Sequence, residues 1–425
     1  MEMVPLSDVQ IVFLDRDWSG SDYPEGIETK FPPADEFVSW HAFEAREELS
    51  PERLTLAVRG LLAHHDGTRT RLAKAYGRWT QHIAPLGDDT PLVWLDAEPD
   101  SVIAEQLTSL NLARGPILKC VYFRRQRLVV LFYNHIALDR VSAQILAEDF
   151  GALLAGRGLA AKTTSLKAWG ERLEECIRSG KWEPHLRRLT DHKLSWPPTG
   201  TALPIDHNPS EEPGDEVTSR MGAAETTALL RRGGKDARPI DLLQTALART
   251  IAPWVGVKAV AMCVVVHGRD PIFDDIDVSR TAGSFAMGLL EVIDPARPPS
   301  RSPYADPRLR FAQVLLNFSR SLEMTYESDG GDRYVNIYDR HNPRVTLNYV
   351  GRVESPGQDD LLRPVELPDW GDTRIRGVST TLDCVVTIEH GRLHATFKFS
   401  PRYFSRSTVE GLATTYIREL TTLIG

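Results

Sequence analysis

Cysteine, long apolar runs and a basic surplus are all scarce or missing in this 425-residue chain. It has four cysteines, and no two of them form a CxxC pair, so neither a zinc ribbon nor a thioredoxin-like site is expected. The longest unbroken apolar run, residues 259–266, is far shorter than the roughly 20 residues that cross a bilayer. The net charge of −8 disfavours a general nucleic-acid binder.

Targeting and cofactor motifs are missing too. The N-terminus MEMVPLSDVQ has no basic patch followed by an apolar stretch, so we expect a cytoplasmic protein without disulfides and without a membrane anchor. No GxxxxGK[ST], no GxGxxG after a strand, no HExxH and no GxSxG motif is present. Nucleotide hydrolysis, dinucleotide redox chemistry, zinc proteolysis and α/β-hydrolase chemistry therefore lose support, and we predict no bound cofactor and no metal.

Proline marks the domain organisation. The stretch SWPPTGTALPIDHNPSEEPGDE is rich in proline, which blocks both helices and central strands. We interpret residues 196–215 as an exposed crossing segment between an N-terminal lobe, 1–195, and a C-terminal lobe, 216–425. A second Pro-rich stretch, residues 295–307, is expected to be a loop within the second lobe.

Both halves mix helical and strand-like apolar spacing, which indicates an α/β or α+β fold. Two strand-like runs, 117–123 and 128–133, are joined by a short basic turn and predict a hairpin. Helices are expected at 51–64, from Val141 to about Leu154, at 240–255 and at 407–424, and further strands at 259–266, 344–350 and 394–399.

The segment LVVLFYNHIALDRVSAQILAEDF carries the main candidate for chemistry. His135 follows a buried strand, and Asp139 lies where the next helix begins and can cap it. A histidine on a short loop held by a strand and a helix is well placed to act as a general base. The spacing HxxxD alone is expected by chance in a chain of this composition, so it needs support from the rest of the sequence.

That support comes from a series of ordered motifs. The chain resembles the condensation-domain superfamily of nonribosomal peptide synthetases, whose signature is HHxxxDG. The likeness runs through PLSDVQIVFL, HHDGTRTRL, GPILK, KTTSLKAWGERL, LPIDHNP, VVVHGRD, RTAGSF and LNYVG, in the family's order. VVVHGRD resembles the epimerization motif EGHGRE, so the closest resemblance is to epimerization-like members.

The resemblance implies two chloramphenicol-acetyltransferase-like lobes in a V, with a tunnel between them. Carrier-protein phosphopantetheine thioesters would enter the tunnel, and His135 would act within it. Asp139 would be structural and paired with Arg269. The candidate tunnel residues are Asn134, Arg140, Val265, Ser284 and Asn348.

Three departures from the family pattern affect the predicted chemistry. Asn134 replaces the first signature histidine, and Arg140 replaces the signature glycine. Arg140 would keep His135 neutral by charge repulsion, narrow the tunnel, bind an anionic donor, or simply be solvated in the first helical turn. Val265 replaces the glutamate that serves an epimerase as second acid or base. Asp270 or Glu291 would have to take over that role.

Other histidines are interpreted as structural. His64 and His65 precede Asp66 and Gly67, but this HHDG lacks the three-residue gap and is interpreted as a helix end before a strand. His267 is expected to pack at the lobe interface. Tyr349, like Asn348, either lines the tunnel or packs.

Three functions remain open from the sequence. The first is a condensation-type acyl or aminoacyl transferase that acts on a carrier protein, with His135 as base. The second is a non-catalytic member that docks a carrier protein or recruits a tailoring oxygenase. The third is an epimerase with a relocated acid. A stand-alone protein is expected because no adenylation or carrier segment is present, although an excised domain fits the sequence as well.

Overall fold

The structure, a computed structural model, describes most of the chain. The described residues are 2–4, 6, 7, 10, 14, 34–75, 78–194, 203–206, 214–232, 238–325, 343–352, 361–365, 382–401 and 403–425. Most of the predicted crossing segment, and most of the opening motif, lie outside these residues. The bounds of the two lobes therefore stay a prediction.

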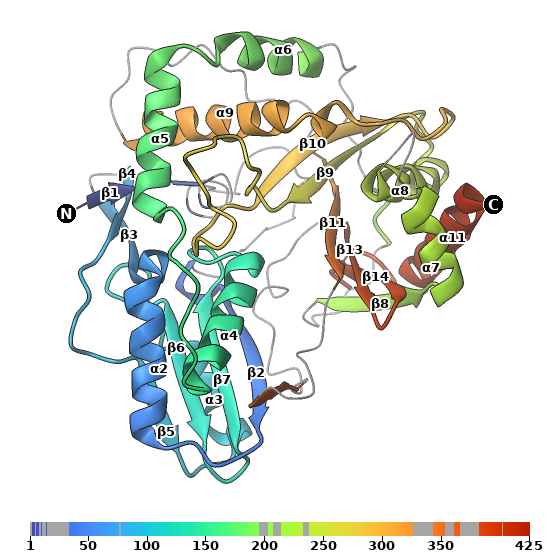
Figure 1. The fold of residues 1–425 in the computed structure, drawn as a ribbon. Helices are drawn as coiled ribbons and strands as arrows, with labels where there is room; N and C mark the ends of the chain where they lie inside the picture. Colours follow the sequence, from blue (N-terminus) through green and yellow to red (C-terminus); the bar gives the residue numbers. More distant parts are fainter. Residues whose placement is uncertain are drawn as a thin grey trace.

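A five-stranded sheet, in the order β12-β2-β7-β6-β5, forms the centre of the N-terminal lobe (Figure 1). β6 and β7 form the predicted hairpin, with Phe123 opposite Leu128. Pairing is antiparallel except between β5 and β6. The strands are β2 (Val38–Ala45), β5 (Leu92–Leu95), β6 (Leu118–Phe123), β7 (Leu128–Asn134) and β12 (Leu362–Pro364).

Helices cover both faces of this sheet. α2 (Pro51–His64) and α4 (Arg140–Leu154) pack on one face, where Leu61 and Phe150 join a cluster with Leu131. α3 (Pro99–Leu107) packs on the other face. Because both faces are covered, every residue of β7 is buried, which explains its continuous apolar sequence.

A six-stranded sheet, in the order β10-β9-β11-β13-β14-β8, forms the C-terminal lobe. β11 runs parallel to both β9 and β13, and the other neighbours are antiparallel. The strands are β8 (Asp215–Arg220), β9 (Val260–Val266), β10 (Met287–Ile293), β11 (Val345–Arg352), β13 (Leu382–Glu389) and β14 (Arg392–Phe399).

One face of this sheet carries the largest hydrophobic core. Val264 and Leu347 from the sheet pack there with Leu247 of α8 and Tyr416 of α11. Six helices contribute to this core, and Figure 1 shows them beside and above the sheet; α5 and α6 come from the first half of the chain, and α8 and α11 match predicted helices. They are α5 (Leu166–Ser179), α6 (Glu183–Leu194), α7 (Ala223–Arg232), α8 (Pro239–Val255), α9 (Pro307–Thr325) and α11 (Arg406–Ile424).

Short elements complete the described fold. β1 (Glu2–Val4), β4 (Arg78–Ile83) and β3 (Thr70–Ala75) form a three-stranded sheet in that order. The 3₁₀ turns are η1 (Ala34–Glu36), η2 (Asp66–Arg69) and η3 (Pro303–Ala305).

Two segments from the second half of the chain connect to the N-terminal lobe. β12 adds to the edge of the five-stranded sheet beside β2 (Figure 1). Residues 267–286, between β9 and β10, form a second connection that we call the bridging segment. Within it, the Asp277 carbonyl accepts a hydrogen bond of 2.8 Å from the Thr164 N–H, and the Gly283 carbonyl accepts one of 3.1 Å from the Asp139 N–H. The bridging segment thereby reaches the start of α4, where the candidate site lies.

Candidate functional site

His135 lies on the short loop between β7 and α4, as the sequence predicts. Its backbone N–H donates to the Phe37 carbonyl at 2.7 Å, which fixes the loop to the residue before β2. The side-chain Nδ1 lies 3.1 Å from the Leu138 carbonyl oxygen. Because a carbonyl oxygen only accepts hydrogen bonds, the neutral ring carries its proton on Nδ1 and its lone pair on Nε2. Nε2 is therefore the basic atom of this half-buried side chain.

Asp139 caps α4, and it also holds a buried ion pair. Its Oδ1 accepts the Ser142 backbone N–H at 2.8 Å, which is the predicted N-cap bond. Arg269 donates to both carboxylate oxygens, at 2.8 and 2.9 Å. The predicted pairing of Asp139 with Arg269 is thus present in the structure, and it links the start of α4 to the end of β9.

Backbone donors of the bridging segment add to this ion pair. The N–H groups of Phe285 and Ala286 donate to Asp139 Oδ2 at 2.9 and 3.2 Å. The Arg269 guanidinium also lies 4.3 Å from the centre of the Phe285 ring. Burial by itself raises the pKa of Asp139, but the Arg269 charge and these hydrogen bonds outweigh it and lower the pKa below its ordinary value. The carboxylate stays ionised and acts as a structural anion.

Ser142 is a site residue that the sequence analysis did not single out. Its hydroxyl accepts from Arg269 and from the Gly283 N–H, at 2.8 and 2.9 Å, and lies 2.8 Å from Asp139 Oδ1 and 2.7 Å from the Gly283 carbonyl. The signal that could have found it is its position three residues after the capping aspartate.

Gly268, the residue before Arg269, forms the backbone turn that leads to the Asp139–Arg269 ion pair. It has φ +66°, and a Cβ there would lie 2.0 Å from the Phe285 carbonyl oxygen. A left-handed φ and a backbone contact both disfavour any other residue.

We therefore expect Gly268→Ala to destabilise the fold by about 2–5 kcal/mol, from the left-handed conformation together with overpacking. The measurement is urea unfolding. Gly351→Ala is the matched control, because Gly351 also has a left-handed φ of +85° but nothing within 4 Å of its Cβ position. If both variants lose the same stability, the contact with Phe285 has no part in the effect.

Asn134 and Arg140, which flank the His135 loop, differ sharply in environment. Asn134 is fully buried: its amide donates to the Ala34 carbonyl at 2.8 Å and accepts the Ile136 N–H at 2.9 Å. The amide is therefore committed to the backbone of the loop. Arg140 is exposed at the first position of α4, which agrees with a solvated side chain.

Val265 and Asn348 are neighbours. They are register partners on the parallel strands β9 and β11, so their side chains share one face of the sheet. Gly288 of β10 flanks Val265 on the other side. Tyr349 lies on the opposite face, where it packs against the large core, and burial raises its pKa.

Neither carboxylate proposed to replace the missing glutamate is available at this face. Asp270 pairs with Arg310, which donates to both of its oxygens at 2.7 and 2.6 Å. Glu291 is buried, and it accepts a hydrogen bond from Ser302. Since Glu291 lies three residues beyond Gly288 along β10, it points to the opposite face from Val265. These contacts engage both carboxylates with other partners, which disfavours a relocated acid at either position.

His267 lies at the start of the bridging segment, and its expected packing at the lobe interface stays a prediction. Its side chain is exposed, and its Nδ1 accepts the Arg269 N–H at 3.0 Å. Nδ1 is therefore an acceptor, and the proton of the neutral ring is on Nε2.

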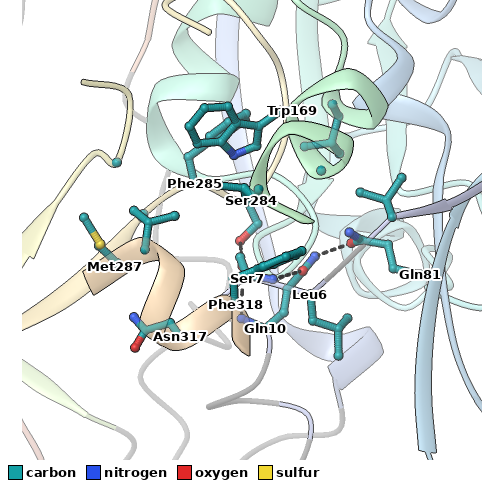
Figure 2. A pocket seen from close by; sticks show the side chains of 17 residues that line it. Leu6, Ser7, Gln10, Gln81, Trp169, Ser284, Phe285, Met287, Asn317 and Phe318 are labelled. Atoms are coloured by element: carbon teal, nitrogen blue, oxygen red, sulfur yellow. Dashed lines mark hydrogen bonds between the residues drawn. The ribbon is translucent and has the colours of Figure 1, made fainter. Parts of the chain in front are cut away.

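Ser284 faces a cavity of about 50 Å³, which Figure 2 shows between α5, α9, the N-terminal strand and the bridging segment. The Ser7 hydroxyl donates to Ser284 at 2.8 Å, and the lining includes Trp169 and Phe318. It does not include His135, Val265 or Asn348. The structure thus places Ser284 apart from the other residues predicted to line a tunnel.

All four cysteines are free thiols, as expected. Among the described helices, none is long and apolar enough to cross a membrane.

Comparison with known proteins identifies relatives of the whole fold. A family model described as "Condensation domain" matches residues 31–297. One of the proteins that make up the linear gramicidin synthase of Brevibacillus parabrevis is 29% identical over 431 residues, which cover 94% of this chain and 8% of that protein. Tyrocidine synthase 1 from the same organism is 23% identical, over 99% of this chain and 40% of that protein. The chain therefore spans only a part of the curated relatives that it matches.

Solved structures share this architecture. The epimerization domain from the third module of tyrocidine synthetase B superimposes with a TM-score of 0.73 at 21% identity, over 92% of each chain. The condensation domain of the monacolin K polyketide synthase gives 0.71 at 14% identity, over 100% and 98% of the two chains. The X-domain in its complex with OxyB from teicoplanin biosynthesis gives 0.66 at 19% identity, over 100% and 94%. These neighbours confirm the mixed α/β, two-lobed fold.

Proposed function

Because this chain belongs to the condensation-domain family of nonribosomal peptide synthesis, we propose that it is an acyl or aminoacyl transferase that takes its donor from a carrier-protein thioester. The observation that carries the proposal is the state of His135. Its Nδ1 is held by the Leu138 carbonyl, so Nε2 carries the lone pair on a loop fixed by β2 and α4. A base in this state accepts a proton without first changing tautomer.

The reaction would join an amine or alcohol to the carbonyl carbon of the donor. As the new C–N or C–O bond forms, His135 Nε2 takes the proton of the attacking group. The C–S bond then breaks, and the same proton passes to the phosphopantetheine sulfur, which leaves as a thiol. The partner is an acyl or peptidyl carrier protein, and the substrate arrives on its phosphopantetheine with no cofactor bound to this chain.

The surroundings of Val265 support transfer over epimerization. Epimerization needs a proton acceptor on one face of the α-carbon and a donor on the other. Val265 can supply neither. Its register partners are Gly288 and Asn348, and Asp270 and Glu291 are engaged elsewhere. His135 alone is sufficient for acyl transfer.

The test is one reaction in heavy water. A carrier-protein domain is charged in turn with a panel of aminoacyl and fatty acyl groups, and amines and alcohols are offered as acceptors. Mass spectrometry then follows the products of the wild type and of His135→Ala. We expect a new acyl–acceptor product that is absent with the variant. A one-deuteron gain at the α-carbon without a new product would show an epimerase instead. Saturable carrier binding without either change would show a docking member, in the manner of the X-domain that is complexed with OxyB.

A substitution at Val265 tests the missing acid directly. We expect Val265→Glu to raise α-deuterium uptake by aminoacyl carrier protein at least about tenfold over the wild type, because one positioned acid or base contributes 10²–10⁴-fold. The measurement is deuterium incorporation by mass spectrometry. Val265→Gln is the matched control, since glutamine has the same size as glutamate but no carboxyl group to act as acid or base. Equal uptake by the two variants would contradict this role for position 265.

A further inference from the structure

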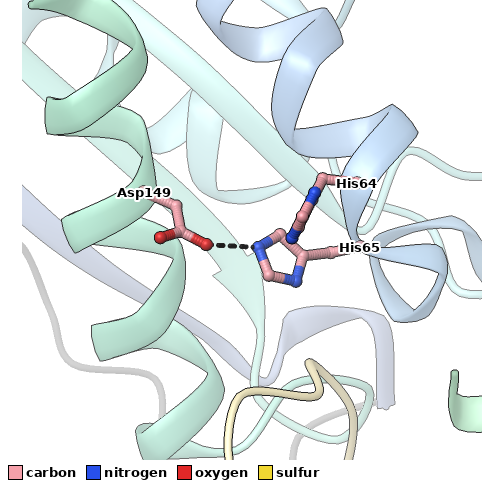
Figure 3. A group of neighbouring side chains, drawn as sticks. All are labelled: His64, His65 and Asp149. Carbon is pink, nitrogen blue, oxygen red and sulfur yellow. Dashed lines mark hydrogen bonds and ion pairs between the residues drawn. The ribbon is translucent and has the colours of Figure 1, made fainter. Parts of the chain in front are cut away.

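Three side chains with metal-ligand chemistry meet between α2 and α4, outside the loop that carries His135. They are His64 and His65, at the end of α2, and Asp149 of α4. The ligating atoms of the three lie within 4.8 Å of one another. Figure 3 shows the two imidazole rings and the carboxylate converging between the two helices. Sequence patterns cannot find this group, because 84 residues separate His65 from Asp149.

We propose that His64, His65 and Asp149 form a binding site for a divalent transition-metal ion, for which Zn²⁺ is the natural probe. The donor set is two imidazole nitrogens and one carboxylate oxygen, a combination that zinc and its first-row neighbours prefer over calcium or magnesium. Three protein ligands leave a fourth position for water. This site is independent of the acyl-transfer proposal.

The three ligating atoms, which lie within 4.8 Å of one another, can reach tetrahedral spacing by shifts of roughly 1 Å. His65 Nε2 lies 2.7 Å from Asp149 Oδ2, joined by a hydrogen bond. Metal–ligand bonds of about 2.1 Å place two tetrahedral ligands about 3.4 Å apart, so the pair must separate by about 0.7 Å. A small cavity of about 10 Å³ adjoins the three side chains.

Arg280 of the bridging segment holds the carboxylate in place. It donates to Asp149 Oδ1 at 2.7 Å and to Glu148 at 2.9 Å. Asp149 Oδ2, which faces His65, is thereby left as the ligating oxygen. Metal-binding carboxylates are commonly held by such an outer hydrogen bond, which orients them toward the ion.

The charges around the cluster accommodate a cation. Lys162 and Arg280 oppose it, but Asp66 also lines the cavity, and Glu148 and Asp149 bond to Arg280. Two carboxylates and two basic groups therefore line the cavity, and Glu148 further offsets the charge of Arg280.

The proposed site lies beside the contact between the N-terminal lobe and the bridging segment. His64 and His65 end α2, Asp149 belongs to α4, and Arg280 belongs to the bridging segment that also contacts Asp139. Arg280 therefore links one proposed ligand, Asp149, to the bridging segment.

The experiment uses the full chain, with no polyhistidine tag, after removal of metal by a chelator. Zn²⁺ is titrated by calorimetry, and Co²⁺ is added separately to record its absorption spectrum. We expect one ion per chain and a tetrahedral Co²⁺ spectrum. His64→Gln should weaken Zn²⁺ binding at least about 100-fold, because loss of an outer-shell partner alone costs 10–100-fold.

Two further variants decide the result. His64→Cys restores a ligand and should regain tight Zn²⁺ binding. His82→Gln is the matched control, since His82 is also a half-buried histidine whose pKa is lowered by burial, but it lies outside the cluster. The proposal is overturned if the wild type takes up no Zn²⁺, or if His64→Gln and His82→Gln bind it as tightly as the wild type.

Discussion

Arg269→Met is expected to destabilise the protein by about 3–5 kcal/mol, because it leaves the buried charge of Asp139 without its partner. The two side chains are only 2% and 4% exposed, so water cannot replace the lost guanidinium. The variant also loses the contacts of Arg269 with Ser142 and with the Phe285 ring. Urea unfolding, followed by circular dichroism, measures the change.

A second ion pair in the same chain provides the control. Arg310 and Asp270 form the same two-bond arrangement, but each is 16% exposed. Arg310→Met should therefore cost less, about 1–2 kcal/mol, because Asp270 keeps access to solvent. If the two substitutions cost the same, burial does not explain the contribution of the Asp139–Arg269 pair.

Lowering the pH should also reduce the free energy of unfolding, because it protonates Asp139. The pKa of Asp139 in the folded protein lies below its ordinary value. The stability that this shift provides is therefore complete above the unfolded-state pKa of about 3.9, and it disappears as the pH falls through the lower, folded-state pKa. Asparagine has no carboxylate to protonate, so the free energy of unfolding of Asp139→Asn should lack this decrease at low pH. Urea unfolding at a series of pH values measures it.

The local elements near the site were predictable because their signals are short-range. The 51–64 helix begins at a proline after a serine cap and coincides with α2. The basic turn between residues 117–123 and 128–133 sets the β6–β7 hairpin. Asp139 could be identified as a cap because an N-cap bond spans only three residues.

The contacts that complete the site are long-range and could not be derived from spacing. Asp139 is 146 residues from Phe285, whose backbone N–H is a donor that any amino acid except proline would supply. Neither the composition of the chain nor the periodicity of its apolar residues can therefore predict this hydrogen bond. The pairing with Arg269 was predicted only through resemblance to family motifs.

The sequence left open whether a nearby carboxylate could replace the missing acid, because it does not show which face of the sheet a side chain occupies. Asp270 and Glu291 lie near Val265 in sequence, and nothing in the sequence favours either. Side chains alternate along β10, so Glu291 points to the opposite face of the sheet from Val265. Asp270 forms an ion pair with Arg310 of α9. Both outcomes depend on partners that a single strand does not reveal.

The largest effect on activity is expected from His135→Ala, which should lower kcat for acyl transfer by about 10²- to 10⁴-fold, the usual contribution of a positioned general base. KM for the charged carrier protein should change little, because the proton is transferred only as the new bond forms. Steady-state kinetics with the carrier and acceptor found in the heavy-water reaction give both constants.

Two substitutions separate catalysis from support of the loop. His135→Gln keeps an amide that can donate to the Leu138 carbonyl but has no basic nitrogen, so it should be as inactive as His135→Ala while retaining more of the fold's stability. Arg140→Gln changes an exposed neighbour of the loop. It should leave kcat within about threefold of the wild type, since substitutions of exposed side chains usually have little effect on the fold. Full activity of His135→Gln would show that His135 orders the loop and that the proton is accepted by another group.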